Sequence, residues 1–408
     1  MRRLVGIIVL VSLFVVPTAA AQEGPSQHLP ADLLYVTLGD VEGADYQRPN
    51  TLMRLDAETL TPSVFYYDAS VEMALIPVSW SPSGTYLTVI RDNGDEVIDL
   101  CLITYGGIRY RCFEKVINRE KYGNRTMDHQ PYWVTWSEDE QSIYFYQDEG
   151  DTIRLVEANI ASGDVVRTVY EQTKPYPQNM ASFYWPQSLS YIMAISFREA
   201  VGLEVTGDFL VGNEIYDVEV VSPDADGSFS MATEITPLFD NRTRFCPGLS
   251  PDETRFVALH YSDNGYPEIL FLAATGETVE SVPASYFQAQ GIRAFKCPTW
   301  EPDSDAVYFL GRSPIFPSGS LAKASLYRYE LGGEEPVPYV TYEAFGLEGD
   351  LYLGDYLVPT PDGATVAFTY APQNFSVWIG IATADGTVVH FKDIRPYVSQ
   401  LLWFPEDK

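Results

Sequence analysis

Four cysteines are the residues of this sequence whose spacing most directly suggests covalent chemistry. Cys101 and Cys112 lie at equal distances from the pair Gly106-Gly107, and Cys246 and Cys297 each precede a proline. A two-residue turn at Gly106-Gly107 would place Cys101 opposite Cys112 across a hairpin, within reach of a disulfide. We predict two disulfides, Cys101–Cys112 and Cys246–Cys297, with free buried thiols as the alternative.

Motifs for nucleophilic, metal or nucleotide chemistry are missing from the sequence. It holds no Gly-x-Ser-x-Gly elbow, no His-Glu-x-x-His, no Cys-x-x-Cys and no glycine-rich phosphate loop. The histidines are scattered at His28, His129, His260 and His390, which disfavours a His-rich metal site. No pattern selects a carboxylate pair of the glycosidase kind. We therefore assign no catalytic or cofactor-binding residue and favour a protein that is not an enzyme.

Three loops combine acidic residues with glycine: Asp92-Asn93-Gly94-Asp95, Asp224-Ala225-Asp226-Gly227 and Ser262-Asp263-Asn264-Gly265. Oxygen-rich loops of this kind suit Ca²⁺, but none follows the twelve-residue EF-hand pattern. Ordinary β-turns account for the same residue types. We predict no metal or other cofactor and keep Ca²⁺ as an open alternative.

The first 21 residues have the pattern of a secretory signal peptide. Arg2 and Arg3 precede the apolar run Leu4–Val16, and Ala19-Ala20-Ala21 offers small residues for cleavage. The run is shorter than the ~20 residues of a membrane-spanning helix, although an uncleaved anchor is the alternative. We expect a secreted or periplasmic protein with no membrane insertion after cleavage, a flexible start over 22–31 and one domain over 32–408.

Composition indicates a soluble β-sheet protein with few anionic partners. The chain has 56 acidic against 26 basic residues, a formal net charge of −30, together with 28 Tyr and 21 Phe. A surface of that sign repels phosphate backbones, so we expect no nucleic-acid partner. Abundant aromatic residues without helical periodicity are typical of sheets.

One phrase recurs every ~45 to 65 residues, close to the length of a four-stranded propeller blade. An aromatic or apolar residue is followed by a Ser, Pro, Asp and Gly-type turn and then by a short strand. The copies are Trp80-Ser81-Pro82-Ser83-Gly84, Trp136-Ser137-Glu138-Asp139-Glu140, Trp185-Pro186-Gln187-Ser188, Leu249-Ser250-Pro251-Asp252-Glu253, Trp300-Glu301-Pro302-Asp303-Ser304, Pro359-Thr360-Pro361-Asp362-Gly363 and Trp403-Phe404-Pro405-Glu406-Asp407.

The last copy ends after a single strand, and the N-terminal stretch supplies the strands that it lacks. Runs at 33–38, 51–55 and 63–67 read as the second, third and fourth strands of that unit. Pairing the two chain ends would close the ring and remove its exposed sheet edges. We predict an all-β fold: a single β-propeller, most simply of seven four-stranded blades.

The Trp-Ser-Pro-Asp-Gly phrase followed by an apolar strand resembles the TolB-type propeller repeat, a relative in shape of the WD40 repeat. The resemblance covers about 32–408. The copies at Trp185 and Pro359 depart from it, which leaves six or eight blades open. The resemblance implies an exported propeller that docks protein partners, and related propellers accompany peptidase domains or carry lyase sites.

The repeat assigns its short turns to one rim of the ring and the long segments to the other, where binding residues usually lie. We predict a binding rim there, because aromatic side chains on rigid loops suit protein or sugar contacts. Packing over the blade ends is the alternative for these side chains. The candidates are Tyr132, Trp133, Tyr176, Phe183, Tyr286, Phe316, Phe345 and Tyr352.

The function predicted from the sequence is that of an exported, non-enzymatic propeller, monomeric, which recognises a protein or glycan through this rim. Two alternatives stay open. One is an extracytoplasmic polysaccharide hydrolase or lyase with acidic residues at the propeller axis. The other is a structural scaffold associated with the cell envelope.

Overall fold

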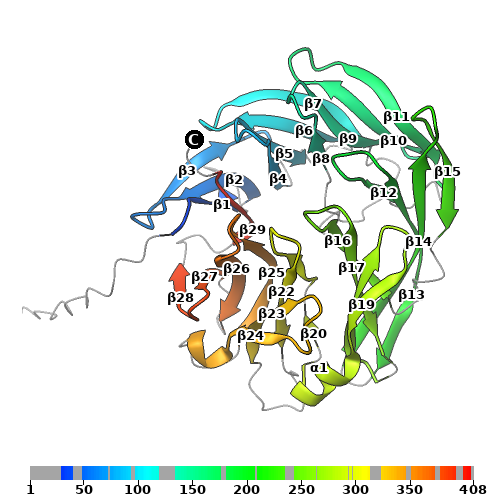
Figure 1. Cartoon of the computed structure of the whole chain (residues 1–408). Coiled ribbons are helices and arrows are strands. Elements are labelled where there is room, and N and C mark those ends of the chain that lie inside the picture. The colour runs from blue at the N-terminus through cyan, green and yellow to red at the C-terminus, as the bar shows by residue number, and fades with distance from the viewer. Residues whose placement is uncertain are drawn as a thin grey trace, which may run out of the picture.

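A computed structural model describes residues 29–39, 48–71, 74–92, 97–118, 134–175, 181–206, 209–234, 243–262, 264–292, 294–295, 297–312, 323–345, 351–372, 377–391 and 398–405. Within these ranges the chain forms a ring of seven β-sheet blades around a central axis (Figure 1). The predicted all-β, seven-bladed propeller is confirmed. Over the described ranges the sequence is apolar and aromatic in short runs separated by turn residues, so it builds mostly strands.

Blade 1 contains both ends of the described chain. Its order is β29-β1-β2-β3, with β29 innermost. Leu33, Leu34 and Tyr35 of β1 pair antiparallel with Trp403, Leu402 and Leu401 of β29. The predicted closure is therefore confirmed in this register. The strands are β1 (Leu33–Gly39), β2 (Arg48–Leu55), β3 (Pro62–Tyr67) and β29 (Val398–Trp403).

Blades 2 to 4 follow in chain order as antiparallel meanders. Blades 2 and 3 are joined into one sheet by a single parallel bridge between Ile117 of β7 and Asp148 of β9. The strands are β4 (Ala74–Trp80), β5 (Tyr86–Asp92), β6 (Val97–Thr104) and β7 (Arg109–Asn118); β8 (Val134–Trp136), β9 (Ser142–Asp148), β10 (Thr152–Asn159) and β11 (Val165–Thr173); β12 (Ala181–Tyr184), β13 (Ile192–Thr206), β14 (Phe209–Pro223) and β15 (Phe229–Glu234).

Blades 5 to 7 complete the ring. The innermost strand of blade 6 is in two pieces, β20 and β21, which both pair with β22. The elements are β16 (Thr243–Leu249), β17 (Arg255–Tyr261), β18 (Pro267–Ala273), β19 (Thr278–Val282) and α1 (Ala284–Gln290); β20 (Ala294–Phe295), β21 (Thr299–Trp300), β22 (Ala306–Arg312), β23 (Ala324–Glu330), β24 (Val337–Val340) and the 3-10 helix η3 (Tyr342–Phe345); β25 (Leu351–Pro359), β26 (Thr365–Pro372), β27 (Trp378–Thr383) and β28 (Val388–Phe391).

The hydrophobic core lies between neighbouring blades. For example, Leu33 and Tyr35 of blade 1 pack with Ile379 and Ile381 of blade 7, and Leu34 of blade 1 packs with the blade 2 core. Leu29 belongs to the first of these clusters, is buried and donates its backbone N–H to the carbonyl of Ala57. The packed part of the described chain therefore includes Leu29, three residues before Asp32.

Both predicted disulfides are present, at Cys101–Cys112 and Cys246–Cys297. The second joins blade 5 to the break between β20 and β21 in blade 6. The first pair is directly opposed in β6 and β7 with a Cα–Cα distance of 4.0 Å. Its predicted turn was wrong, because Gly107 donates to Thr104 and the turn is centred one residue earlier. A bulge at Tyr110 restores the pairing of the two cysteines.

Candidate functional site

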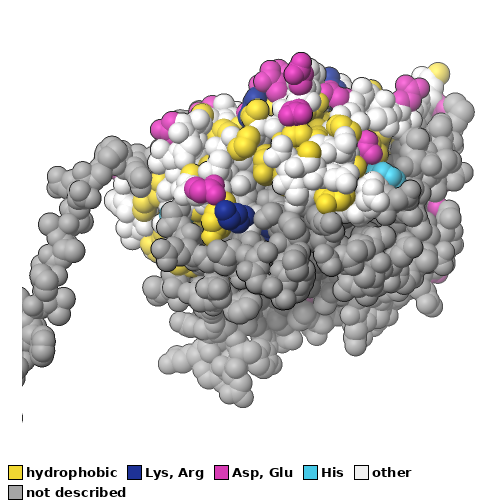
Figure 2. All heavy atoms as spheres, turned by 90° about the horizontal axis from the view of Figure 1, so that it is seen from below, with side chains coloured by type: hydrophobic (Ala, Val, Ile, Leu, Met, Phe, Trp, Pro, Cys, Tyr) yellow, Lys and Arg dark blue, Asp and Glu magenta, His cyan; other side chains and the backbone are white. Residues whose placement is uncertain are grey.

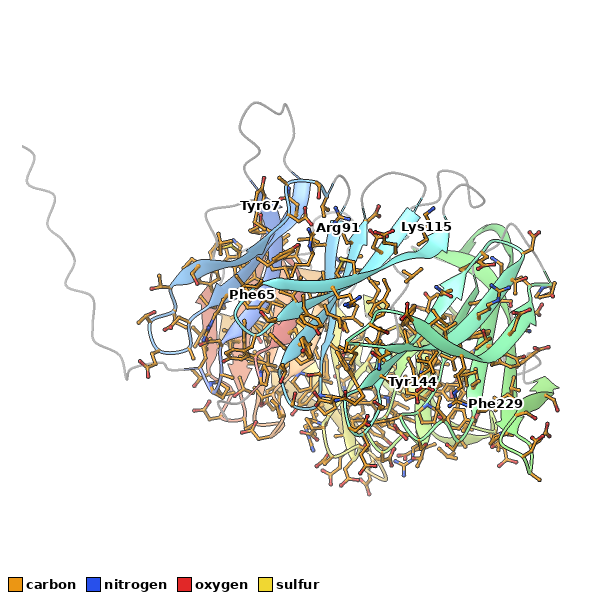
Figure 3. All side chains as sticks on the ribbon, turned by 90° about the horizontal axis from the view of Figure 1, so that it is seen from above. Phe65, Tyr67, Arg91, Lys115, Tyr144 and Phe229 are labelled. Carbon is orange, nitrogen blue, oxygen red and sulfur yellow. A yellow bond between two sulfur atoms is a disulfide. The ribbon has the colours of Figure 1, made fainter. Side chains whose placement is uncertain are left out.

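The two rims of the ring differ in construction. We call one the turn rim; it carries the turns after the first and the third strand of each blade, such as 81–84 and 161–163. We call the other the long-loop rim; it carries the connections from Asn118 to Val134 and from Arg312 to Ala324. In Figure 3, Arg91 and Lys115 lie toward the long-loop rim, while Tyr144 lies lower, toward the turn rim.

At the turn rim, the hydroxyl and carboxylate groups of the repeat hold their own turns. Ser137 Oγ accepts from the Ser142 N–H at 2.9 Å and donates to Asp139 at 2.7 Å. The Asp139 carboxylate also accepts from the Gln141 N–H, and that hydrogen bond lowers the pKa of Asp139. The copies at Ser250 and Thr360 repeat these bonds. The carboxylates of the repeat are thus structural acceptors.

In the copies of blades 3, 5 and 6, the fifth residue of the repeat phrase connects its turn to the turn of the preceding blade. It has a positive φ in Glu140 (52°), Glu253 (61°) and Ser304 (66°). Glu140 accepts from the backbone N–H and the hydroxyl of Ser83 in blade 2. Ser304 Oγ accepts from the Asp252 N–H at 2.8 Å in the same manner. The strained backbone is therefore used to aim a side chain at the neighbouring blade.

Two copies have glycine at this fifth position, and there the preceding blade fills the space. A Cβ on Gly84 would lie 2.7 Å from Cγ of Pro405, the proline of the last repeat copy. A Cβ on Gly363 would lie 3.0 Å from Oε1 of Glu301. At the turn rim these contacts form a belt that joins blades 1, 2 and 3 and blades 4, 5, 6 and 7.

Glu301 replaces the usual Ser or Thr of the repeat and is the most buried carboxylate of this belt. Its side chain accepts from Arg328 at 2.6 Å and from the Tyr308 hydroxyl at 2.9 Å. Burial, followed by the hydrogen bond to Glu301, raises the pKa of Tyr308 above its usual range. The Tyr308 hydroxyl also contacts the Gly363 carbonyl of blade 7 at 3.1 Å. This carboxylate joins two blades, and its partners explain its burial without a catalytic role.

Buried ion pairs gather toward the long-loop rim. Arg91 bridges Asp68 of blade 1 at 3.0 Å and Asp99 of its own blade at 3.1 Å. Asp99 also accepts from the Lys115 N–H, where Lys115 adopts φ 60° in a bulge of β7. The charged network therefore fixes the end of blade 2 against blade 1.

A second buried pair lies in blade 3, where Lys174 Nζ donates to both carboxylate oxygens of Asp148 at 3.0 and 3.2 Å. Their side chains are 1% and 4% exposed. Asp148 also accepts from the Gly150 N–H. Charges this deep require both partners, so the pair fixes the segment after β11 to the end of β9.

Bulges break the innermost strands around the axis. Extra residues interrupt the pairing of β4 at Val78, of β25 between Leu353 and Leu357, and of β29 at Gln400. Gln400 has φ 50° and donates its side-chain amide to the Tyr356 hydroxyl at 3.0 Å. Bulges redirect side chains at rims and sites, so these axial residues are additional candidates that the repeat pattern did not reveal.

The predicted rim residues differ in burial, and some of them lie outside the described residues. Phe183 and Phe345 are buried with 1% exposure, so for these two the packing alternative holds. Tyr286 is half-buried, and its hydroxyl donates to the Pro336 carbonyl at 2.8 Å. Tyr352 is in β25 without a described side chain. The remaining four lie outside the described residues: Tyr132, Trp133, Tyr176 and Phe316.

Of the three loops that combine acidic residues with glycine, the one at Asp224–Gly227 is described in full and forms a turn. Asp226 accepts from the Ser228 N–H and hydroxyl, which lowers the pKa of Asp226. The Asp92 and Ser262 loops each contain residues outside the described part. Among the described residues, no three His, Cys, Asp or Glu side chains converge on a point that could hold a metal. Ca²⁺ binding therefore stays an untested alternative. In the same part of the chain, no helix has the length and apolarity to cross a membrane.

Comparison with solved structures agrees with the propeller fold. The chain is similar to the β-propeller domain of the Trilobed protease from Pyrococcus furiosus, with TM-score 0.52, 13% identity, and coverage of 90% of this chain and 95% of that one. It is similar to a prolyl endopeptidase, with TM-score 0.55, 10% identity, and coverage of 93% and 51%. This chain thus spans about half the length of that endopeptidase.

TolB from Acinetobacter baumannii is also similar, with TM-score 0.46, 12% identity, and coverage of 92% of this chain and 67% of that one. No protein-family model and no curated protein matches the sequence. Identities this low show the fold alone. The protein is a seven-bladed β-propeller, and the propeller fold expected from the repeat is confirmed.

Proposed function

We propose that this chain is an exported propeller without enzymatic activity that binds a protein or a glycan through its long-loop rim. The observation that carries the proposal is the contrast between the rims. At the turn rim, the polar side chains of the repeat are occupied by contacts within and between blades, as for Glu140 and Glu301. The long connections, and with them the room for recognition residues, are at the opposite rim.

Export is the second part of the proposal, and it rests on two features. The N-terminal sequence Arg2–Ala21 has the pattern of a signal peptide. The two disulfides suit an oxidising compartment such as the periplasm or the extracellular space. N-terminal sequencing of the protein recovered from its native source tests this part, with a start near Gln22 expected. A retained Arg2-Arg3 start would contradict cleavage.

The binding part is tested by affinity measurements with the mature chain. The wild type is screened by biolayer interferometry on a glycan array and on envelope or surface proteins of the source cell. The double variant Tyr132→Ala/Trp133→Ala is then compared on each ligand with Glu138→Ala, an exposed turn-rim residue, as the matched control. We expect the double variant to weaken binding at least tenfold while the control binds normally.

Three results would replace the proposal. Turnover of a polysaccharide in the same panel would favour the hydrolase or lyase alternative. Binding that is lost in the turn-rim control and retained in Tyr132→Ala/Trp133→Ala would assign recognition to the turn rim. A constitutive complex with an envelope protein that needs neither rim would favour the scaffold alternative.

A further inference from the structure

The connection between blades 6 and 7 is held by an aromatic side chain inserted into blade 7. Phe345, at the end of η3, is 1% exposed. Its ring lies 5.6 Å from Phe368, 5.7 Å from Tyr370 and 6.3 Å from His390, measured between ring centroids. These three residues come from β26 and β28, so a single residue of the connection contacts both strands.

A glycine on the strand between them makes this socket possible. Gly380 of β27 lies opposite Phe368 on one side and His390 on the other. A Cβ on Gly380 would be 2.4 Å from the Phe368 ring. Because position 380 carries no side chain, the Tyr370 hydroxyl reaches across β27 to His390 Nδ1 at 2.7 Å. The imidazole is thereby tied to the wall of the socket that holds Phe345.

The surroundings of His390 favour its neutral form. Burial lowers the pKa of His390, while a hydrogen bond with the backbone of Phe345 acts in the opposite direction. On η3 and on the strands that form the socket, the titratable groups besides His390 are Tyr342 and Glu343 on η3 and Tyr370 on β26, with Lys323 preceding β23. Glu343 is 71% exposed and is paired with Lys323 at 3.4 Å. No carboxylate of this set contacts the imidazole.

We propose that His390 and Tyr370 form a pH-sensitive latch that holds Phe345, and with it the 341–345 connection, against blade 7. In the neutral state Tyr370 donates its hydroxyl proton to Nδ1. Protonation places a hydrogen on Nδ1 as well, so Tyr370 can keep the contact only by turning its hydroxyl proton away, and the new charge is half-buried among aromatic rings. The latch opens as the pH falls below about 6.5, the ordinary pKa of histidine. The latch does not depend on which ligand the protein binds.

Hydrogen–deuterium exchange of the full mature chain tests the latch. Peptides covering 341–345 are compared at pH 7.5 and pH 5.0, after correction for the intrinsic pH dependence of exchange. We expect protection in wild type to fall at least fivefold at pH 5.0. Peptides from the turn at 250–253, which holds no histidine, serve as the internal control and should keep their protection.

Three variants separate the latch from a general effect of acid. His390→Gln cannot take up a proton and should show the same protection at both pH values. Phe345→Ala should show low protection at both. Tyr370→Phe should lower protection at pH 7.5 and reduce the difference between the two pH values. A wild type with equal protection at both pH values, or a His390→Gln protein that keeps the full difference, would overturn the proposal. Should His390→Gln fail to fold, the Tyr370→Phe result decides.

Discussion

The turn rim and the long-loop rim are built from the same repeat, yet they bury different kinds of polar group. The turn rim joins its blades through hydroxyls, backbone N–H groups and turn carboxylates, as between Ser83 and Glu140. Toward the long-loop rim, a buried charge pair joins two blades between Arg91 and Asp68, and another fixes a segment within blade 3 between Lys174 and Asp148. In Figure 2, acidic side chains stand along the upper edge of the described face, toward the turn rim, and expose charge there.

The difference shows which residues are required by the fold: those of the repeated turns are, and those of the irregular segments are less so. A turn that holds itself and its neighbour needs the same residue types in every copy, which is why the phrase recurs. A buried ion pair is specific to one blade and stabilises one irregular segment. The irregular segments of the long-loop rim therefore have room for recognition residues.

Ring closure should have the largest effect on stability. Deleting the last eight residues removes Leu401, Leu402 and Trp403 of β29, which pair with β1, and Phe404, which is 2% exposed. Loss of one buried aromatic residue costs about 3–5 kcal/mol, and whole domains have only about 5–15 kcal/mol. We expect the truncated chain to lose its cooperative unfolding transition in thermal circular dichroism. A truncated chain that melts like wild type would mean that blade 1 does not need β29.

The buried pair of blade 3 should respond far more strongly than an exposed pair. Lys174→Ala leaves the Asp148 carboxylate buried without its ammonium group, for which we expect about 3–5 kcal/mol of destabilisation. Lys323→Ala breaks the exposed pair with Glu343 and should cost at most about 1 kcal/mol. Urea unfolding of the two variants gives both values. Equal losses of unfolding free energy in the two variants would mean that the buried pair contributes no more to stability than the exposed pair.

Glycine at the fifth repeat position should be required by the neighbouring blade as well as by its own φ. In Gly84→Ala the new methyl meets Pro405, whereas Gly386→Ala has the same sign of φ, 82°, but nothing within 4 Å. Both variants carry the strain of a positive φ, about 1–2 kcal/mol. Overpacking adds about 1–3 kcal/mol in Gly84→Ala only. Matching free energies of unfolding for the two would place Pro405 away from Gly84 in solution.

The side-chain contact from Glu140 to Ser83 should have the smallest effect. Glu140→Ala removes both hydrogen bonds and keeps the positive φ, for which we expect about 1–2 kcal/mol of destabilisation. Glu140→Gly removes the same bonds but relieves the backbone, so it should cost less than Glu140→Ala. A glycine variant that is the less stable of the two in urea unfolding would show that backbone strain at this position is not relieved by glycine.

The fold could be predicted because its signals are local and repeated. Each strand and turn of the repeat is encoded within a few residues, and the truncated last copy pointed to β1 as its partner. The pairing of Cys101 with Cys112 was predicted from a turn that differs in detail, because a bulge at Tyr110 compensates for the shift. Such compensations lie in backbone geometry that residue types alone do not specify.

The site could be predicted less well, because its parts depend on contacts between blades. Phe345 has the residue type of an exposed binding aromatic, yet it is buried against Phe368 and Tyr370 of another blade. Lys174 and Asp148 are separated by 26 residues, and no motif relates them. The fifth position of the phrase was visible in the sequence, but its role toward the preceding blade needs the ring.

The most direct test of the account compares affinity variants of the two rims for one ligand, once the wild-type screen has supplied it. The set is Tyr132→Ala/Trp133→Ala and Tyr176→Ala, which are predicted to lie at the long-loop rim, with Glu138→Ala and Asp303→Ala at the turn rim. Each variant is first shown to melt like wild type. The account predicts at least a tenfold loss of affinity for long-loop variants and less than a twofold change for turn-rim variants. A loss confined to Glu138→Ala or Asp303→Ala would contradict it.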